Sequence, residues 1–308
     1  MPLASDRSGL EERPTPYGAT ITTEYITFCL ESRDTPIGER TPMAGDNEQI
    51  GALKARGAAL MRNNRLAEAK ALFTQICEMQ AGDAEAWYVL SGINGMLGNI
   101  DEAGECCRRV IALQPDHGEA HVNFGNVLFY QKKIDEAISH YQTALSINPN
   151  NAGALCSLGN VFSALGRHDD AAAQYQAAVR LNPNIVEAYY NLGNAQSALK
   201  KYDEAVENYR QAIRRHPNYA AAYNNLGNAL KAQGAVEQAA ENYRHAIKLQ
   251  PDFATAYNNL AILLIGQGRL DEAEELTKRA LQIQPNSVEA YINLSNIFME
   301  RRNLDEAY

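Results

Sequence analysis

Apolar residues recur along most of this chain at steps of three and four, the spacing of one face of an α-helix. The stretch 186–219 shows two such runs on either side of Lys200 and Lys201: Ala188, Tyr189, Leu192 and Ala195, then Ala205, Val206, Tyr209, Ala212 and Ile213. We therefore predict two amphipathic helices with a break at the paired lysines. Pro217 follows the second run, and a proline has no amide proton with which to continue a helix.

The same pair of runs repeats every 34 residues. Six prolines keep the period without a slip, as does an alanine through eight copies: Pro115, Pro149, Pro183, Pro217, Pro251 and Pro285; Ala69, Ala103, Ala137, Ala171, Ala205, Ala239, Ala273 and Ala307. A fixed period of this size is typical of stacked repeats, in which each unit packs only on its neighbours. We predict an all-α solenoid over residues 50–308, with seven full repeats and a truncated eighth.

Small and bulky residues hold fixed positions, counted here from 1 to 34 with Val186 as position 1 of its repeat. Position 8 is small in every repeat, and position 20 is the recurring alanine. Position 24 is aromatic in five repeats: Phe73, Tyr141, Tyr175, Tyr209 and Tyr243. Close packing of helices needs this alternation of small and large side chains, so we expect these positions to form the core.

These positions resemble the tetratricopeptide repeat, whose consensus has Leu at 7, Gly at 8, Ala at 20, an aromatic residue at 24 and Pro at 32. The resemblance covers residues 50–308. It implies a right-handed solenoid of helix–turn–helix repeats, in which the first helix of each repeat lines a concave surface. Positions 2, 5, 6, 9, 12 and 13 would face into that surface.

Asparagines recur at two of these inner positions, although Asn is a mediocre helix former. Position 6 carries Asn123, Asn191, Asn225, Asn259 and Asn293, and position 9 carries Asn126, Asn160, Asn194, Asn228 and Asn296. Residues three apart share one helix face. An amide both donates and accepts hydrogen bonds, which suits the backbone of an extended peptide. We predict that these ten residues bind peptide; the alternative is structural, with the position-9 amide bonding to the neighbouring repeat.

The remaining candidate sites are better explained by structural roles. His117 and His121 flank Glu119, but the glutamate is misplaced for a zinc-protease helix, and His121 occupies the packing position 4. Acidic pairs such as Asp203 and Glu204 recur at positions 18 and 19, where negative charge favours a helix N-terminus. We therefore expect no catalytic residues, no metal site and no cofactor.

Charge and cysteines limit the partners and the compartment. The net charge is −9, and the first 48 residues hold nine acidic and four basic residues, which leaves the repeats nearly balanced. Without a basic stripe, nucleic acid is not an expected partner. Five cysteines, an odd number, favour a reducing compartment. No apolar run of about 18 residues and no secretory signal occur, so we expect a cytoplasmic protein that does not cross a membrane.

The first 48 residues contain five prolines and no repeat. We predict that they are mostly disordered, with Tyr25–Leu30 the candidate for a short ordered stretch. At the other end, the sequence stops at Tyr308 within the second helix of the eighth repeat. Leu304 and Ala307 then have no following helix to cover them, which predicts self-association.

Two functions remain open at this point. The first is a non-enzymatic scaffold that binds extended polypeptide in its concave, Asn-lined groove. The second rests on a further resemblance, of NLGNALKAQG and NYRHAIKLQPDFATAYNNLA, to the repeat domain of protein O-linked N-acetylglucosamine transferases and related bacterial repeat proteins. It implies a substrate-selecting arm whose catalytic domain is absent from this chain.

Overall fold

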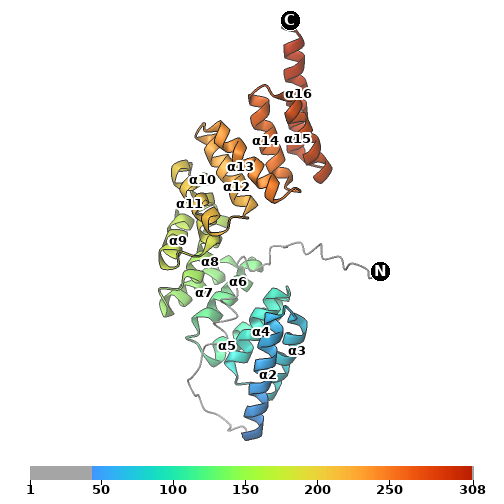
Figure 1. The fold of residues 1–308 in the computed structure, drawn as a ribbon. Coiled ribbons are helices and arrows are strands. Elements are labelled where there is room, and N and C mark those ends of the chain that lie inside the picture. Colours follow the sequence, from blue (N-terminus) through green and yellow to red (C-terminus); the bar gives the residue numbers. More distant parts are fainter. Residues whose placement is uncertain (1–43, 307–308) are drawn as a thin grey trace, which may run out of the picture. The chain divides into compact units, whose positions relative to one another are not determined.

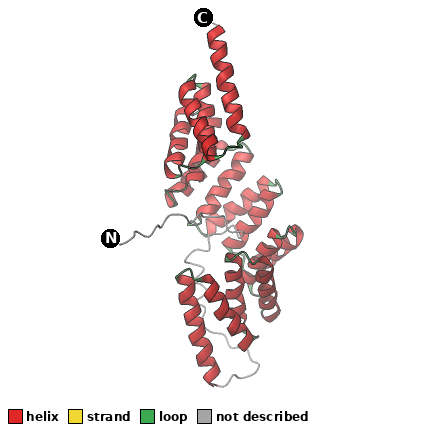
Figure 2. Ribbon diagram, turned by 90° about the vertical axis from the view of Figure 1, so that its right-hand side faces the viewer, coloured by secondary structure: helices red, strands yellow, loops and turns green. Residues whose placement is uncertain are grey.

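The structure, a computed structural model, describes residues 44–306, with side chains for residues 47–302. Of the segment 1–48 predicted to be mostly disordered, residues 1–43 lie outside the described residues, as does the candidate ordered stretch at Tyr25–Leu30, whereas residues 44–48 are helical. Between residues 44 and 306 every regular element is an α-helix, and no strand occurs (Figure 2). The all-α fold that the period predicts is confirmed.

The chain divides into two compact units, Met1–Val161 and Phe162–Tyr308, with the boundary inside α8 (Ala152–Ala164). In the first unit, successive antiparallel helices pair into repeats (Figure 1). They are α2 (Ala44–Arg62), α3 (Leu66–Met79), α4 (Ala84–Met96), α5 (Ile100–Leu113), α6 (Gly118–Tyr130) and α7 (Ile134–Ile147). Helix α2 begins at Ala44, before the start that the period sets for the first repeat.

The second unit continues the same alternation of first and second helices. Its helices are α9 (His168–Leu181), α10 (Val186–Ala198), α11 (Tyr202–Arg215), α12 (Ala220–Ala232), α13 (Val236–Leu249), α14 (Ala254–Gly266), α15 (Leu270–Ile283) and α16 (Val288–Glu306). In both units the core lies between the helices of a repeat and its neighbours. The alanines at position 20 from Ala69 to Ala273 are fully buried, and the four tyrosines at position 24 are at most 2% exposed.

The turn between the two helices of a repeat has a left-handed residue at position 15. Seven residues with positive φ stand there, 34 apart: Asn64, Gly98, Lys132, Gly166, Lys200, Gly234 and Gly268. A left-handed residue ends the first helix and lets the chain reverse, and glycine adopts this conformation without steric cost. The break expected at Lys200 and Lys201 is confirmed, with Lys200 itself at φ 60°.

The eighth repeat departs from this pattern. Arg302 holds position 15, yet the chain stays helical there, and α16 runs without a turn from Val288 to Glu306. The second helix that the sequence predicts from Leu304 therefore does not appear as a separate element. An L-residue in the left-handed region costs free energy, whereas a continuous helix keeps its backbone hydrogen bonds.

Candidate functional site on the first helices

A recurring core motif explains the asparagines at position 9. The buried tyrosine at position 24 donates its hydroxyl hydrogen to the amide oxygen of the position-9 asparagine in its own repeat. The three bonds are Tyr141 to Asn126 (2.8 Å), Tyr209 to Asn194 (2.9 Å) and Tyr243 to Asn228 (2.8 Å). Burial raises the pKa of Tyr209 to about 12. A buried hydroxyl without a partner costs free energy, so these asparagines stabilise the core.

The glycine at position 8 belongs to the same motif. A Cβ atom on Gly125, Gly193 or Gly227 would stand 2.6–2.7 Å from the ring of the tyrosine in the same repeat, closer than atoms pack. Glycine thus makes room for the ring, and the next residue, Asn, takes its hydroxyl. In each of these repeats the glycine and the asparagine are therefore both explained by the tyrosine of the same repeat.

Repeats that lack the tyrosine lose the motif in a graded way. In the first repeat Phe73 has a ring but no hydroxyl, and Gly57 is kept while Ala58 replaces the asparagine. In the seventh repeat Thr277 has no ring, and Ala261 and Ile262 replace both residues. The hydroxyl of Thr277 instead donates to the carbonyl oxygen of Ala273 (2.7 Å). Position 9 therefore follows position 24 within this one sequence.

The asparagines at position 6 connect neighbouring repeats. Asn225 on α12 donates from Nδ2 to Asn194 Oδ1 (2.9 Å) and to the Tyr190 hydroxyl (3.0 Å), both on α10. Asn259 on α14 donates to Asn224 Oδ1 on α12 (2.9 Å), and Asn224 donates to Asn225 Oδ1 (3.1 Å). The four amides of Asn194, Asn225, Asn224 and Asn259 form one hydrogen-bonded chain across three first helices. We call these four residues the amide row.

One of the ten asparagines predicted to bind peptide, Asn293, is buried. Asn293 on α16 is 1% exposed, and its Nδ2 donates to the backbone oxygen of Asn258 (3.3 Å). An amide buried in this way cannot reach a ligand at the surface. The other nine predicted asparagines lie half-buried on α6, α8, α10, α12, α14 and α16. The structural alternative is thus realised in a different form at three positions: the oxygens of Asn126, Asn194 and Asn228 bond within their own repeat, and Asn194 also bonds to the next one.

Position 5 is among the predicted inner positions, but sequence reasoning did not single out the residues that occupy it. Asn224 and Tyr190 both stand there, and both take part in the bonds around the amide row. The adjacent asparagines at 224–225 and 258–259 were the available signal. Of two consecutive asparagines on a first helix, one bonds to the preceding repeat and the other to the following one. Asn225 bonds to Asn194 of the preceding repeat, and Asn224 accepts from Asn259 of the following repeat.

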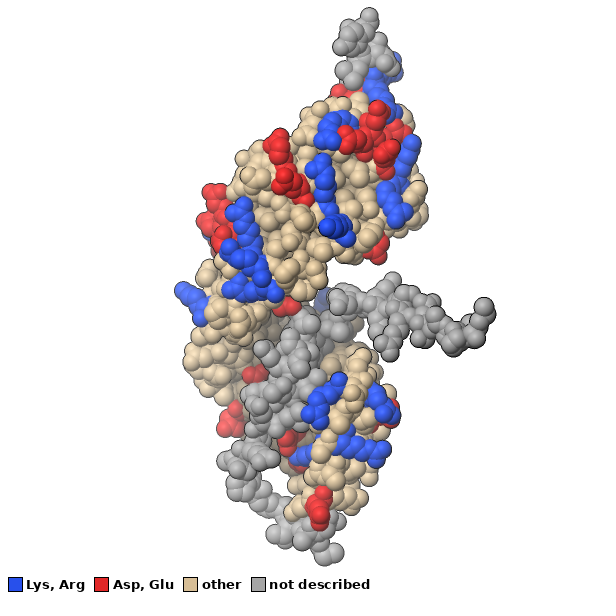
Figure 3. All heavy atoms as spheres, viewed as in Figure 1, with Lys and Arg blue, Asp and Glu red and all other residues tan. Residues whose placement is uncertain are grey.

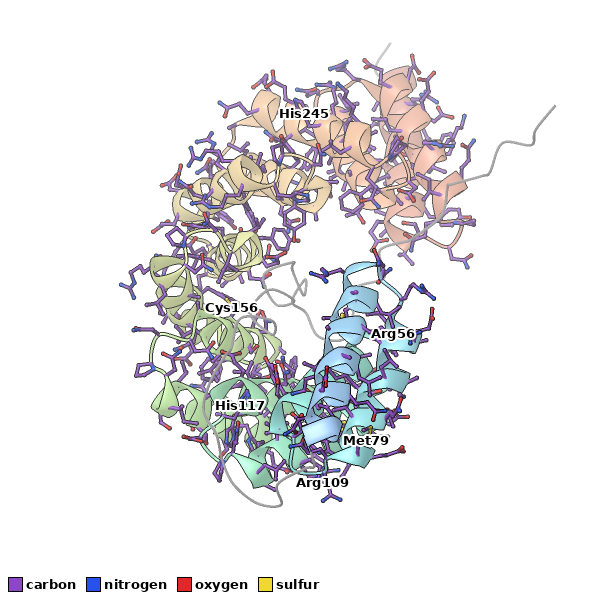
Figure 4. All side chains as sticks on the ribbon, turned by 60° about the horizontal axis from the view of Figure 1, so that its bottom comes forward. Arg56, Met79, Arg109, His117, Cys156 and His245 are labelled. Carbon is purple, nitrogen blue, oxygen red and sulfur yellow. The ribbon has the colours of Figure 1, made fainter. Side chains whose placement is uncertain are left out.

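The two candidate metal-binding histidines are held by protein groups. His121 Nε2 lies 3.0 Å from the carbonyl oxygen of Pro115, which only accepts, so this nitrogen carries the hydrogen. Its Nδ1 then accepts from Nδ1 of His140 at 2.9 Å. His117, labelled in Figure 4, accepts the amide hydrogen of Ala120 on its Nδ1 (3.2 Å) and so caps α6. Between residues 44 and 306 no cluster of three metal-ligating residues occurs.

The thiols in the described part of the chain are free, and three of them lie in the core. Cys77, Cys106 and Cys107 are buried, and burial raises the pKa of Cys106 to about 11 and that of Cys77 to about 12. A protonated buried thiol is a poor nucleophile and a packing group.

Charged side chains of both signs lie among one another on the face seen in Figure 3. Arg269, for example, pairs with Glu272 at 2.5 Å, and Arg301 contacts Asp271 and Glu274, each at 2.6 Å. Such exposed pairs contribute little stability.

Comparison with known proteins agrees with this geometry. Models described as tetratricopeptide repeat match residues 54–116, 156–220, 193–244 and 264–308, and a model described as TPR repeat matches residues 125–166 and 227–268. The chain belongs to the tetratricopeptide repeat family. A search of curated proteins found no significant match, and the comparisons give no support to the resemblance to O-linked N-acetylglucosamine transferases.

Solved tetratricopeptide repeat structures share the fold. MamA is 31% identical over 52% of this chain and 94% of its own, with a TM-score of 0.50. PilF of Pseudomonas aeruginosa is 20% identical over 69% of this chain and 96% of its own (TM-score 0.63). YrrB, described as a TPR protein with an unusual peptide-binding site, is 21% identical over 62% of this chain and 99% of its own (TM-score 0.55). Among the described residues, no helix is both long and apolar enough to span a bilayer.

Proposed function

We propose that this protein is a non-enzymatic scaffold that binds an extended polypeptide along the first helices of its repeats. The amide row is the observation that carries the proposal. Its bonds run from each repeat to the one before it, so the amides are already fixed in one arrangement. A ligand that meets fixed groups loses less conformational freedom on binding than one that must order them.

Two half-buried residues of the row, Asn194 and Asn259, keep hydrogen-bonding capacity for a ligand, whereas Asn224 is buried and holds the row together. The bonds described above use one hydrogen of the Asn259 amide and leave its oxygen able to accept. The oxygen of Asn194 accepts two bonds, and its –NH2, which also bonds to the Tyr190 hydroxyl, keeps a second hydrogen to donate. Donors and acceptors in alternation match a peptide backbone, which offers both at every residue. Such contacts are indifferent to side chains and therefore tolerate many sequences.

Repeat spacing sets the expected length of the ligand. Packed helices lie about 8–10 Å apart, and an extended chain advances about 3.3 Å per residue. About three ligand residues therefore span one repeat, and a peptide of roughly six residues spans the two repeat steps from α10 to α14. YrrB, which shares the fold, offers a precedent for peptide binding.

Selection of a random-peptide phage library on the full chain tests the proposal. The blocking variant is Thr255→Trp, which places a bulky ring at exposed position 2 of α14, one of the inner positions. The matched control is Gln238→Trp on α13, also exposed but on a second helix. We expect enriched peptides that bind the wild type and the control and lose binding to Thr255→Trp, with all three proteins melting alike.

The proposal fails if no peptide is enriched, or if enriched peptides bind Thr255→Trp as well as the control. Asn225→Ala is less suitable as the first variant, because it removes two bonds between repeats and so alters stability together with binding.

A further inference from the structure

Ile262 is an exposed apolar side chain on the helix face that carries the amide row. It stands at position 9 of α14, three residues after Asn259, and residues three apart share one helix face. Its exposed fraction is 42%, whereas α10 and α12 carry no large exposed apolar side chain. Helix α14 bonds to α12 through Asn259 and to α16 through Asn258, so a missing neighbour does not explain the exposure.

The core of the seventh repeat does not require an isoleucine at this position. Thr277 replaces the tyrosine at position 24, so no hydroxyl in the core needs an asparagine at position 9. A small residue would fill the same place, as Ala58 does in the first repeat. Ile265, one turn further along α14, is half-buried against the core and widens the apolar surface. The exposed part of Ile262 is therefore available to a ligand.

Lys231 on α12 lies beside this apolar surface. The hydrogen bond from Asn225 to Asn194 joins residues 31 apart on α12 and α10. Ile262 and Lys231 are also 31 apart, and each stands three residues further along its helix than the corresponding member of that pair. Because the first helices of consecutive repeats run parallel, the two side chains face each other in the same way. Lys231 is half-buried, as expected of a stem that lies along apolar surface with its ammonium in water.

The charge of Lys231 is not balanced by a neighbour. Its ammonium has no acidic partner among residues 47–302, whereas Lys201 and Lys278 pair with carboxylates. Lys231 is also the one basic residue of α10, α12 and α14, whose one acidic residue, Glu187, stands at the start of α10. The inner face thus offers one positive charge next to one apolar surface.

We infer that Ile262, Ile265 and Lys231 together select a short motif in the bound polypeptide: a large aliphatic residue with an Asp or Glu two residues from it. This inference rests on the proposed function and adds a side-chain preference to the amide row, which is indifferent to side chains. The aliphatic side chain loses apolar surface to water against the two isoleucines. The carboxylate pairs with the ammonium and contributes specificity more than affinity.

The spacing of the motif follows from the geometry of an extended chain. Alternate side chains of such a chain point to the same side, and two residues advance about 6.6 Å. Neighbouring helices lie about 8–10 Å apart, and the lysine stem covers the remaining distance. An acidic residue directly next to the aliphatic one would point away from Lys231.

Selection of a random-peptide phage library on the wild type and on two variants tests the inference. Ile262→Asn removes the apolar surface and introduces the residue that five other repeats have at this position. Lys231→Glu reverses the charge. The matched controls are Leu249→Asn and Lys248→Glu, an exposed apolar and an exposed basic residue on the second helix α13.

We expect the wild type and both controls to enrich peptides with an aliphatic residue and an acidic residue two positions apart. These peptides should bind Ile262→Asn roughly tenfold or more weakly in fluorescence polarisation, because the buried aliphatic side chain loses its contact. Selection on Lys231→Glu should replace the acidic residue with Lys or Arg at the same spacing. The melting temperatures of all five proteins should agree.

The inference and the proposed function fail in different ways. Enriched peptides that lack the motif, or that bind Ile262→Asn and Lys231→Glu as tightly as the wild type, overturn the inference. The proposed function still stands in that case if Thr255→Trp blocks the same peptides. If the wild type enriches no peptide at all, the proposed function fails and the preference fails with it. If Ile262→Asn does not fold, the selection on Lys231→Glu decides the outcome.

Discussion

Single positions in this protein are linked by the space that one tyrosine ring occupies. Gly193 leaves room for the ring of Tyr209, and Asn194 accepts its hydroxyl hydrogen. The first and seventh repeats, which lack the tyrosine, support this link. The repeat with Phe73 has the glycine but not the asparagine, and the repeat with Thr277 has neither. Two adjacent residues of the first helix and one tyrosine of the second are therefore one unit of the core.

Gly193→Ala should destabilise the protein. In an open helix the change would stabilise by about 1 kcal/mol, because glycine is a poor helix former. Here the new Cβ would lie 2.7 Å from the Tyr209 ring, and overpacking costs roughly 1–3 kcal/mol. We expect a net loss of about 1 kcal/mol in urea unfolding.

The control for this change is Gly51→Ala on α2, where a Cβ would meet nothing within 4 Å. That variant should be more stable than the wild type. Equal stabilisation by both substitutions would show that the tyrosine ring moves aside at little cost.

The His121–His140 pair should make stability depend on pH. Burial, and then the neighbouring His121, lower the pKa of His140 from its ordinary value of 6.5. The folded state then binds fewer protons than the unfolded chain just below that value, so stability falls as the pH drops below about 6.5. Protonation of both rings would also place two N–H donors against each other across 2.9 Å.

His140→Gln removes the titration and keeps a donor for His121. Melting temperatures measured from about pH 7.5 to 5.5 should fall less steeply in this variant than in the wild type. His117 has a lowered pKa through burial, and Glu119 a raised one. Both remain in the variant, and the difference between the two curves isolates His140. Parallel curves would show that the pair does not titrate in this range.

Helices in this fold end and reverse through one left-handed residue at position 15. Four of the seven are glycines, whereas Lys132 and Lys200 adopt the same conformation at φ 64° and 60°. A side chain there costs about 1–2 kcal/mol, part of which glycine returns as greater entropy of the unfolded chain.

Lys200→Gly should therefore stabilise the protein by roughly 0.5–1 kcal/mol, measured as a shift of the urea midpoint. Lys201→Gly is the matched control, because Lys201 has φ −84°, which any residue adopts. It should be neutral or destabilising. A destabilised Lys200→Gly would mean that the lysine side chain contributes more than its backbone conformation costs.

At the scale of the whole molecule, the described repeats share one fold and differ in the side chains on their first helices. Within the second unit the amide row occupies α10, α12 and α14, while α16 carries five large apolar side chains that are more than half exposed. The net charge of −9 and the mixture of signs on the surface leave nucleic acid an unexpected partner, and that exclusion stays a prediction.

The amino-acid sequence alone determined the helices, their 34-residue period, the turn at Lys200 and the buried positions 20 and 24. All of these are local or periodic properties, set by which residues recur at which spacing. It also singled out the asparagines as unusual, because their recurrence has no explanation in helix propensity. The peptide-binding role given to them remains a proposal.

Only the tertiary structure decided what those asparagines touch. Asn194 meets Tyr209 in its own repeat and Asn225 in the next, and Asn293 is buried against the backbone of Asn258. These contacts depend on how helices pack, which a period does not specify. Likewise, the chain stays helical at Arg302, although each of the seven preceding repeats turns at this position, and the period alone does not indicate the difference. The sequence specifies which residues occupy each position of a repeat. The packing of one repeat on another decides which of their side chains remain accessible to a ligand.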